Sequence, residues 1–459
     1  MSAHQGPVSE SHVIHRTPKV PIRKAVGGDR VYVIDDQGNR YLDACGGAAV
    51  CCLGYNDPTV KQAISDQLAA LPYVHSGFFT TDVMENLGDR LAALAPGDLN
   101  NVYFVSGGSE AVEAALKLAR QYFAEIGETN RVRIIAREQS YHGNTLGALA
   151  AGGNKMRRQI FNPMLADVYT HIEPCFPYRR MREDETEEEY AIRAADALEA
   201  EILRLGPDSV AAFIAETVGG ATAGVLVPAP GYFRRIREIC DKYGILLILD
   251  EVMCGFGRTG TLFACEQDGV VPDLLTVAKG LGGGYQPIGA LFASDRVNEA
   301  VLNGTGFFQH GHTYIGHAAA CAASMAVLDV IERDNLLENV KERGQQLNRL
   351  LHENFDNHPY VGNIRGRGLF QGVEIVADRS SKTPFDPALK VNAKIKKEAM
   401  DRGLMCYPGG GTADGLKGDH ILLAPAFIIE ETEITEIVDR LKAAVDAVTY
   451  QAAAGQAAE

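Results

Sequence analysis

ILLILDEV, residues 245–252, and LLTVAKG, residues 274–280, decide the fold. Each is a short apolar run that leads to a charged side chain, Asp250 in the first and Lys279 in the second. Runs of this kind predict buried strands. Between residues 101 and 294, the similar runs NVYFVS, VRIIAR, AAFIAET and IGALFAS alternate with longer amphipathic stretches. The alternation predicts an α/β fold in which a mainly parallel sheet has helices on both faces.

The two ends of the chain predict a second, smaller domain. VYVIDDQGNRYLD, residues 31–43, alternates apolar and polar residues around a glycine-containing turn, which indicates a hairpin. The C-terminal part contains strand-like GLFQGVEIV and HILLAPAF with two amphipathic helical stretches, and we expect it to fold back against that hairpin. We expect a flexible N-terminal arm over residues 1–20, a small domain made of 21–75 and 335–450, a large domain over 76–334, and a mobile tail over 451–459.

The composition argues against several classes of partner. Asp and Glu number 59 against 44 Lys and Arg, which gives a formal net charge of -15 that repels nucleic acid and anionic lipid. No apolar run approaches the roughly 20 residues that span a bilayer, and the first residues lack the order of a secretory signal, so we expect a cytoplasmic protein. The nine cysteines lack a Cys-x-x-Cys pair, which predicts reduced thiols. His310, His312 and His317 match no usual ligand spacing, so we predict no metal.

A carboxylate at the end of a buried strand and a lysine that precedes glycines are what a pyridoxal phosphate enzyme needs. The Lys279 amine can bond to the aldehyde of that cofactor, and Asp250 can hold the pyridine nitrogen protonated so that the ring accepts electrons. Lys279 directly precedes GLGGG at the end of an apolar strand, which is a poor place for a solvated charge. We therefore expect desolvation to lower its pKa, which suits a nucleophile and general base.

A phosphate site is predicted where the strand NVYFVS is followed by a helix. Gly107, Gly108 and Ser109 lie at this junction, and the free amides and positive dipole end of a helix favour an anion. The same residues also make an ordinary helix start, so the motif alone leaves both interpretations open. Ligands of open α/β sheets bind beyond the carboxyl ends of the strands, where Asp250 and Lys279 are also expected.

DEVMCGFGRTG, residues 250–260, and TVAKGLGGG, residues 276–284, closely resemble class III pyridoxal-phosphate-dependent aminotransferases, a fold type I group. The resemblance covers the chain from about Val31 to Val448. It implies a large domain with a mainly parallel seven-stranded sheet flanked by helices, together with a small α+β domain. It also implies pyridoxal 5'-phosphate as cofactor and Lys279 and Asp250 as the catalytic residues.

The resemblance further implies which residues contact the cofactor. It assigns the phosphate to the motif at residues 107–109 and an aromatic ring on the cofactor's face to Tyr141, which by itself would be interpreted as a ring packed on the sheet. Glu216 corresponds to the acidic residue near the pyridine 3-hydroxyl, and Val252 is a further expected contact. The family usually has proline where this chain has Thr217, which puts only the local turn in question.

Thr313, in the segment HTYIGH, resembles the residue that the family sends across a dimer interface to the partner's cofactor phosphate. By itself it would be one more surface hydroxyl. The resemblance therefore implies a homodimer with active sites shared between two chains.

The substrate is the least determined part of the prediction. Family members that act on ornithine or 4-aminobutyrate usually carry an arginine in the strand before the C-terminal proline motif, and this chain has Leu422 there. It therefore resembles more closely the branch that transfers the amino group of an ω-amino acid or amine to pyruvate. Lys417 and His420, from the glycine-rich loop at residues 407–420, are candidates for the substrate carboxylate, with Phe79 and Phe308 as further candidate contacts.

The predicted activity is a ping-pong aminotransferase, with an amine donor and a 2-oxo acid acceptor. An aminomutase or decarboxylase of the same fold is the alternative, because the same cofactor chemistry supports both. Gly255, Gly257 and Gly260 also spell a dinucleotide-binding G-x-G-x-x-G, but the segment after them is too short and broken for the long helix that a nicotinamide enzyme needs. A non-catalytic relative would be expected to lack Lys279 or Asp250, and both are present.

Overall fold

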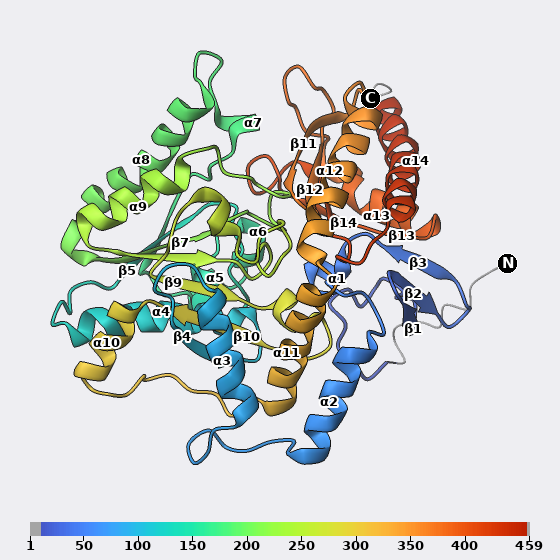
Figure 1. Ribbon diagram of the computed structural model, residues 1–459. Helices are drawn as coiled ribbons and strands as arrows, with labels where there is room; N and C mark the ends of the chain where they lie inside the picture. The colour runs from blue at the N-terminus through green and yellow to red at the C-terminus, as the bar shows by residue number, and fades with distance from the viewer. Residues whose placement is uncertain (1–10, 457–459) are drawn as a thin grey trace.

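The computed structural model describes residues 11–456 and has a seven-stranded sheet at its centre (Figure 1). The strand order is β4-β10-β9-β8-β7-β5-β6. Only β10 runs antiparallel to its neighbours, so the mainly parallel seven-stranded sheet is confirmed. The strands are β4 (Asn101–Val105), β5 (Arg133–Arg137), β6 (Tyr169–Ile172), β7 (Val210–Glu216), β8 (Leu246–Asp250), β9 (Leu274–Val277) and β10 (Gly289–Ala293).

The central strands are apolar on both faces because both faces are covered by helices. Phe213 and Leu247 pack on one side, and their neighbours Ile214 and Ile248 pack on the other, as the two-residue period of a strand requires. The helices of this part of the chain are α3 (Asp82–Leu94), α4 (Gly108–Glu125), α5 (Leu146–Ala151), α6 (Lys155–Arg158), α7 (Pro177–Arg180), α8 (Glu187–Leu205), α9 (Tyr232–Tyr243), α10 (Asp295–Asn303) and α11 (Ala318–Arg333). Helices α3, α8, α9 and α11 cover the face of Phe213, and α4, α5 and α10 cover the face of Ile214.

Both ends of the chain form the second body, at the right of Figure 1. One of its sheets joins β1 (Ala25–Asp29), β2 (Tyr32–Asp35) and β3 (Arg40–Asp43) to β13 (Leu404–Met405), and the other has the order β11 (Val361–Arg367), β12 (Phe370–Ile375), β15 (Asp419–Leu423) and β14 (Tyr407–Gly410). Its helices are α1 (Gly46–Ala49), α2 (Pro58–Ala70), α12 (Leu336–Phe355), α13 (Val391–Asp401) and α14 (Glu431–Gln456). Because β13 pairs with β3, residues from the two ends of the chain share one sheet.

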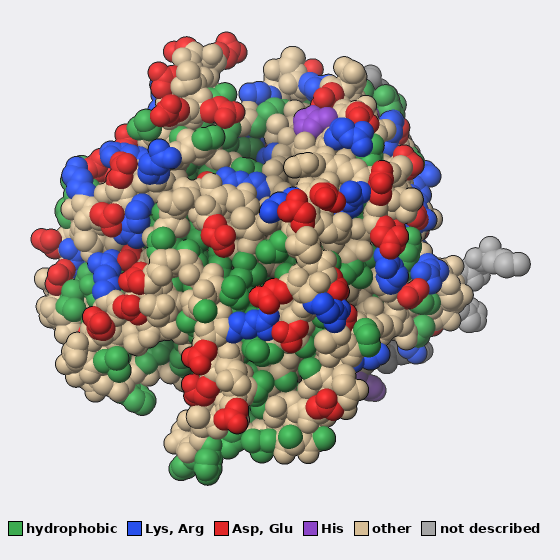
Figure 2. All heavy atoms as spheres, in the orientation of Figure 1, with side chains coloured by type: hydrophobic (Ala, Val, Ile, Leu, Met, Phe, Trp, Pro, Cys, Tyr) green, Lys and Arg blue, Asp and Glu red, His purple; other side chains and the backbone are tan. Residues whose placement is uncertain are grey.

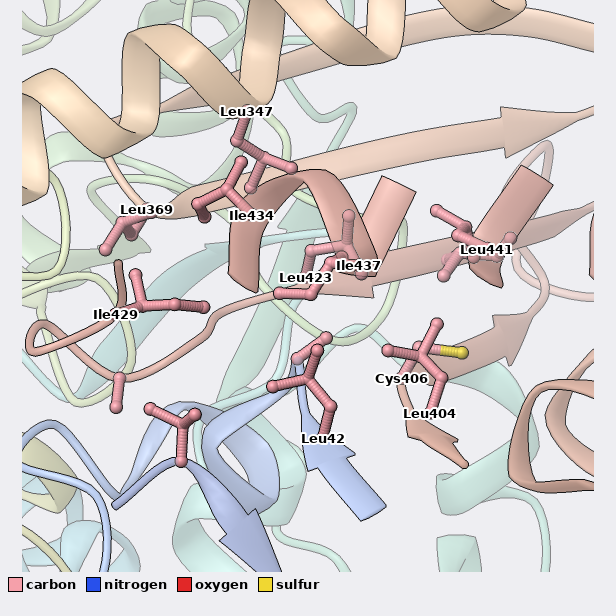
Figure 3. Close-up of a cluster of buried hydrophobic side chains, with 14 of the residues drawn as sticks. Leu42, Leu347, Leu369, Leu404, Cys406, Leu423, Ile429, Ile434, Ile437 and Leu441 are labelled. Atoms are coloured by element: carbon pink, nitrogen blue, oxygen red, sulfur yellow. The ribbon is translucent and has the colours of Figure 1, made fainter. Parts of the chain in front are cut away.

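These elements are held together by one hydrophobic core. Figure 3 shows Leu42 of β3 close to side chains of the C-terminal part, among them Leu347 of α12, Leu423 of β15 and Leu441 of α14. All four side chains are fully buried. Burial of this apolar surface supplies most of the free energy that holds the N-terminal hairpin against the C-terminal part.

The end of α14 extends into the predicted tail. The helix continues through Gln456, and Ala452 is buried. Alanine and glutamine are strong helix formers, which explains why the helix does not stop earlier. Residues 1–10 of the predicted arm and residues 457–459 lie outside the described residues, and residues 11–24 belong to no helix or strand.

No helix between residues 11 and 456 combines the length and the apolar character needed to cross a membrane.

Gly344 provides a test of the packing of α12 against the turn between β11 and β12, and that turn contacts the loop after β8. A Cβ at Gly344, on α12, would overlap with the backbone of Gly368, and a Cβ at Gly368 would lie 2.7 Å from the Thr259 carbonyl carbon. In a helix, alanine is usually about 1 kcal/mol more favourable than glycine. At position 344, however, its Cβ would have to push the backbone of Gly368 away. We therefore expect Gly344→Ala to lower stability by about 1 to 3 kcal/mol, measured as a lower midpoint of thermal unfolding.

The matched control is Gln345→Ala, at the next and exposed position of the same helix. It should change stability by no more than about 0.5 kcal/mol. A Gly344→Ala variant as stable as the wild type would show that α12 is free to shift away from Gly368.

Candidate active site

A cavity of about 560 Å³ lies beyond the carboxyl ends of β4, β5, β7, β8 and β9. This is the edge at which open α/β sheets bind ligands. Its lining includes every cofactor contact that the sequence predicted within one chain, namely Gly107, Gly108, Ser109, Tyr141, Glu216, Asp250, Val252 and Lys279.

The junction between β4 and α4 suits a phosphate. A Cβ at Gly107 would meet no atom within 4 Å, so this backbone faces open space, whereas a Cβ at Gly108 would lie 2.6 Å from Val252 Cγ1. Glycine is thus required at Gly108 for the close approach of α4 to the loop after β8. The first amides of α4, from Gly108 to Glu110, have no acceptor within the helix. Ser109 Oγ accepts a hydrogen bond from the Asn144 amide at 3.0 Å and keeps its own proton for another acceptor.

Asp250 is held in place by two hydrogen bonds. Its Oδ1 accepts from the Val252 amide at 3.0 Å, and its Oδ2 lies 2.7 Å from Nδ1 of His142. The His142 side chain is fully buried. The two contacts therefore fix the orientation of the carboxylate at the end of β8.

His142 was not predicted as a site residue. It follows Tyr141 directly in the sequence, and a titratable residue beside a predicted cofactor contact was the available signal. Its Nε2 is buried and has no hydrogen-bond partner within residues 11–456.

Glu216 positions Tyr141. Its two oxygens accept hydrogen bonds from the Tyr141 amide at 3.0 Å and the Gly220 amide at 2.8 Å. Burial raises the pKa of Glu216 above its ordinary value, and the nearby charge of Asp250 raises it further. The Glu216 carboxyl group therefore holds the backbone at Tyr141 in place.

Thr217 replaces the proline that is usual in the family, and the structure gives it a hydrogen bond. Its Oγ1 donates to Glu251 at 2.9 Å, and Glu251 also accepts from the Ala264 and Cys265 amides at 2.6 and 2.7 Å. Burial raises the pKa of Glu251 to about 7. Thr217 thus helps to satisfy a buried carboxyl group that holds the segment after β8, where proline could not donate.

Lys279 lies on the cavity wall in a strained backbone conformation. It follows β9 and has φ of 43°, in the left-handed region that residues other than glycine rarely adopt. Such strain is found mainly where the surrounding structure fixes a functional residue. Burial lowers the pKa of its amine, while the charges of Asp250 and Glu216 oppose that shift. A larger share of the amine is then neutral and nucleophilic.

Two arginines at the cavity were also missed. The Arg157 guanidinium lies over the Tyr141 ring, 4.6 Å from its centroid, and both Arg157 and Arg16 line the cavity. Neither forms an ion pair with a carboxylate in the described part of the chain. The run MRR at residues 156–158 carried no positional signal, because only the fold shows which of its arginines faces the cavity.

The remaining candidates do not line this cavity in their own chain. Thr313 is exposed and its carbonyl accepts a hydrogen bond from the Tyr73 hydroxyl at 3.1 Å. Phe79 is 67% exposed, and Phe308 packs edge-on against Tyr103.

Lys417 and His420 lie in the hairpin formed by β14, β15 and the loop between them, away from the cavity lining. Lys417 is exposed, and its amide donates to Asp414. His420 is fully buried with Nδ1 2.6 Å from the Thr412 hydroxyl. Burial lowers the pKa of His420 to about 3, so its ring is neutral at pH 7.

The loop after β8 does not have the dinucleotide-binding form. GFGRTG is followed by the short 3-10 helix η4 (Ala264–Asp268). A dinucleotide fingerprint needs a long helix that starts at the glycines.

The chain matches known aminotransferases over nearly its whole length. A model of the family "Aminotransferase class-III" matches residues 12–445. An uncharacterized aminotransferase of Schizosaccharomyces pombe is 47% identical over 433 residues, which cover 93% of this chain and 92% of the relative. A probable aminotransferase of Mycobacterium tuberculosis is 41% identical, with 90% and 87% covered.

Solved structures with a similar fold are also aminotransferases. An (S)-enantioselective omega-transaminase from Thermomicrobium roseum superposes with a TM-score of 0.90 at 36% identity, covering 96% of this chain and 97% of that one. The omega transaminase from Pseudomonas jessenii, solved in complex with PMP, gives 0.92 at 31% identity, with 98% and 99% covered. Together with a cavity that joins Lys279, Asp250 and a phosphate cradle, these matches show that the chain belongs to the class III aminotransferases, enzymes that use pyridoxal phosphate.

Proposed function

We propose that this aminotransferase moves the amino group of an ω-amino acid or primary amine to pyruvate or another 2-oxo acid by a ping-pong mechanism. The proposal rests on one observation, that Lys279, Asp250 and the motif at residues 107–109 line the same cavity. Two further facts favour this substrate class. The structural relatives from Thermomicrobium and Pseudomonas are omega-transaminases, and buried Leu422 occupies the position where relatives that act on ornithine or 4-aminobutyrate usually have an arginine.

The residues present fit the cofactor, and each has a distinct task. When bound, pyridoxal phosphate supplies an electron-accepting ring that stabilises the charge left when the substrate carbon loses a proton. The amides at Gly108 and Ser109 would hold the phosphate, and Tyr141 would cover the ring. Asp250, which contacts His142, would hold the proton on the pyridine nitrogen. Lys279 Nζ is the base that takes the proton from the substrate carbon, because burial keeps part of it neutral.

Arg157 is our candidate for the substrate carboxylate, in place of Lys417 and His420. It shares the cavity with Lys279, and its stacking on Tyr141 orients the guanidinium while leaving its edge free. A guanidinium binds a carboxylate through two parallel hydrogen bonds. His420 is buried and neutral, and Lys417 is exposed outside the cavity, so neither offers a positive charge there.

We also propose a homodimer in which Thr313 reaches the partner's phosphate site. Exposed aromatic side chains occur in the two segments that meet at Thr313: Phe78 (81% exposed) and Phe79 (67%) in one, Phe307 (62%) and Tyr314 (58%) in the other. The two segments are held together because the Tyr73 hydroxyl bonds to the Thr313 carbonyl and the Tyr73 ring packs edge-on against Tyr314. Figure 2 shows hydrophobic side chains at the lower end of the molecule, over the loop between α2 and α3. Patches of this kind mark protein interfaces.

A panel of amine donors tests the proposed reaction. With pyruvate as acceptor, the holoenzyme should form alanine from ω-amino acids or primary amines, and Lys279→Ala should lose on the order of a thousandfold or more of that rate together with the visible absorption of the bound cofactor. Lys394→Ala, at an exposed lysine of α13, is the control and should retain both. Release of CO2 or an isomerised amine without alanine would favour a decarboxylase or aminomutase instead.

Arg157→Gln should weaken the half-reaction of pyruvate more than that of an uncharged amine. Loss of one charge-assisted contact predicts a kcat/KM roughly ten- to a hundredfold lower for pyruvate. Lys155→Gln removes the same charge from α6 but from a residue outside the cavity lining, so it should have little effect. Single-turnover rates of the two half-reactions provide the measurement. Equal losses in both halves would mean that Arg157 acts only by holding Tyr141.

Mixed dimers test the shared site. Lys279→Ala and Thr313→Glu should each be inactive, the second because its carboxylate repels the partner's phosphate. After subunit exchange, a hybrid dimer contains one site with an intact lysine and an intact threonine, so about a quarter of the wild-type activity should return when the two variants are mixed equally. Exchange is verified with subunits carrying different tags. If hybrids form and remain inactive, Thr313 does not act across the interface.

A further inference from the structure

A second cavity of about 340 Å³ opens from the first. The two share Arg16, Arg157, Ala221 and Tyr407 as lining residues. The second cavity, here called the vestibule, extends along the whole of β14 to Lys396 on α13. A ligand that reaches from Lys279 past Arg157 would therefore enter the vestibule.

The vestibule is positively charged although the chain as a whole is acidic. Arg16, Arg157 and Lys396 line it, and its lining contains no Asp or Glu. In the described part of the chain none of the three forms an ion pair. Two lysines on the same helices are engaged instead, since Lys155 on α6 lies 3.8 Å from Glu138 and Lys397 on α13 pairs with Asp401.

Another cavity with cations differs from the vestibule because its lining also contains two carboxylates, Glu183 and Glu187. Arg365 and Arg367 line a pocket beside β11, but Arg365 is paired with Glu374 and Arg367 with Asp268. Their charges are satisfied by the fold. Within residues 11–456 the three cations of the vestibule have no such carboxylate partners, and they repel one another. An anion bound between them would remove that repulsion, so the vestibule favours an anionic ligand.

We propose that the vestibule is a subsite for the terminal carboxylate of a long ω-amino acid donor. This inference rests on the proposed function and adds to it. The amine of the donor reacts at Lys279, its carbon chain passes Tyr407 and Ala221, and its carboxylate lies between Lys396 and Arg16. Arg157, at the border of the two cavities, binds the carboxylate of shorter acids such as pyruvate. Donors long enough to pass Arg157 are therefore preferred over plain amines of the same length.

Matched donors test the subsite. The ratio of kcat/KM for 8-aminooctanoate to that for octylamine reports the contribution of the terminal carboxylate. Lys396→Met should lower this ratio roughly three- to tenfold, because an exposed cation contributes less than a buried one. Lys394→Met, which removes a charge from the same helix but outside the vestibule, should leave the ratio unchanged. The same ratio in wild type and both variants would overturn the proposal.

A binding measurement separates this inference from the proposed function. Suberate, an eight-carbon dicarboxylate, should bind the holoenzyme in calorimetry, and Lys396→Met should weaken that binding by a similar factor while Lys394→Met does not. If no amine is transaminated, the proposed function fails, and a weaker suberate affinity in Lys396→Met alone still supports the subsite. Suberate binding that is insensitive to Lys396→Met rejects the subsite even if transamination is observed.

Discussion

The register between parallel strands β7, β8 and β9 is the constraint on which the site depends. It places Glu216 beside Asp250 and Asp250 beside Thr276, three residues before Lys279. A slip of one residue would turn each of these side chains to the other face of the sheet. Two neighbouring carboxyl groups repel each other, and His142 relieves that repulsion by its hydrogen bond to Asp250. The register thus determines both the position of the charges and the need for a buried histidine.

The packing around this edge also maintains a strained lysine. The left-handed backbone at Lys279 costs on the order of 1 to 3 kcal/mol, which the surrounding contacts must offset. The neighbouring Gly280 packs against Phe256, and a Cβ at Gly282 would overlap with the backbone at Gln286. Glycines on the C-terminal side of the lysine let the chain turn tightly enough to keep its amine directed at the cavity.

The C-terminal part completes the cavity and is joined to the central sheet by a buried cation. Arg258, from the loop after β8, donates to the carbonyls of Leu369 and Pro425 and stacks on Phe427. Its burial lowers its pKa to about 10, so it remains charged at pH 7. This contact fixes the C-terminal part relative to Asp250, and Tyr407 of β14 then lines both the cavity and the vestibule.

The sequence by itself predicted a mainly parallel sheet from six strand-like runs, and it indicated Lys279, Asp250 and the motif at residues 107–109, because strand ends and glycine turns are set by local patterns. The seventh strand, β6, matches none of those runs, and the number seven came only from the family resemblance. The sequence also did not indicate that α14 extends through Gln456 into the predicted tail. Only the tertiary structure decided which polar side chains meet from distant segments. His142 contacts Asp250 across 108 positions, and Arg16 joins Arg157 and Lys396 at one opening. Such contacts depend on the packing of segments that are far apart in the sequence, so a local sequence pattern does not predict them.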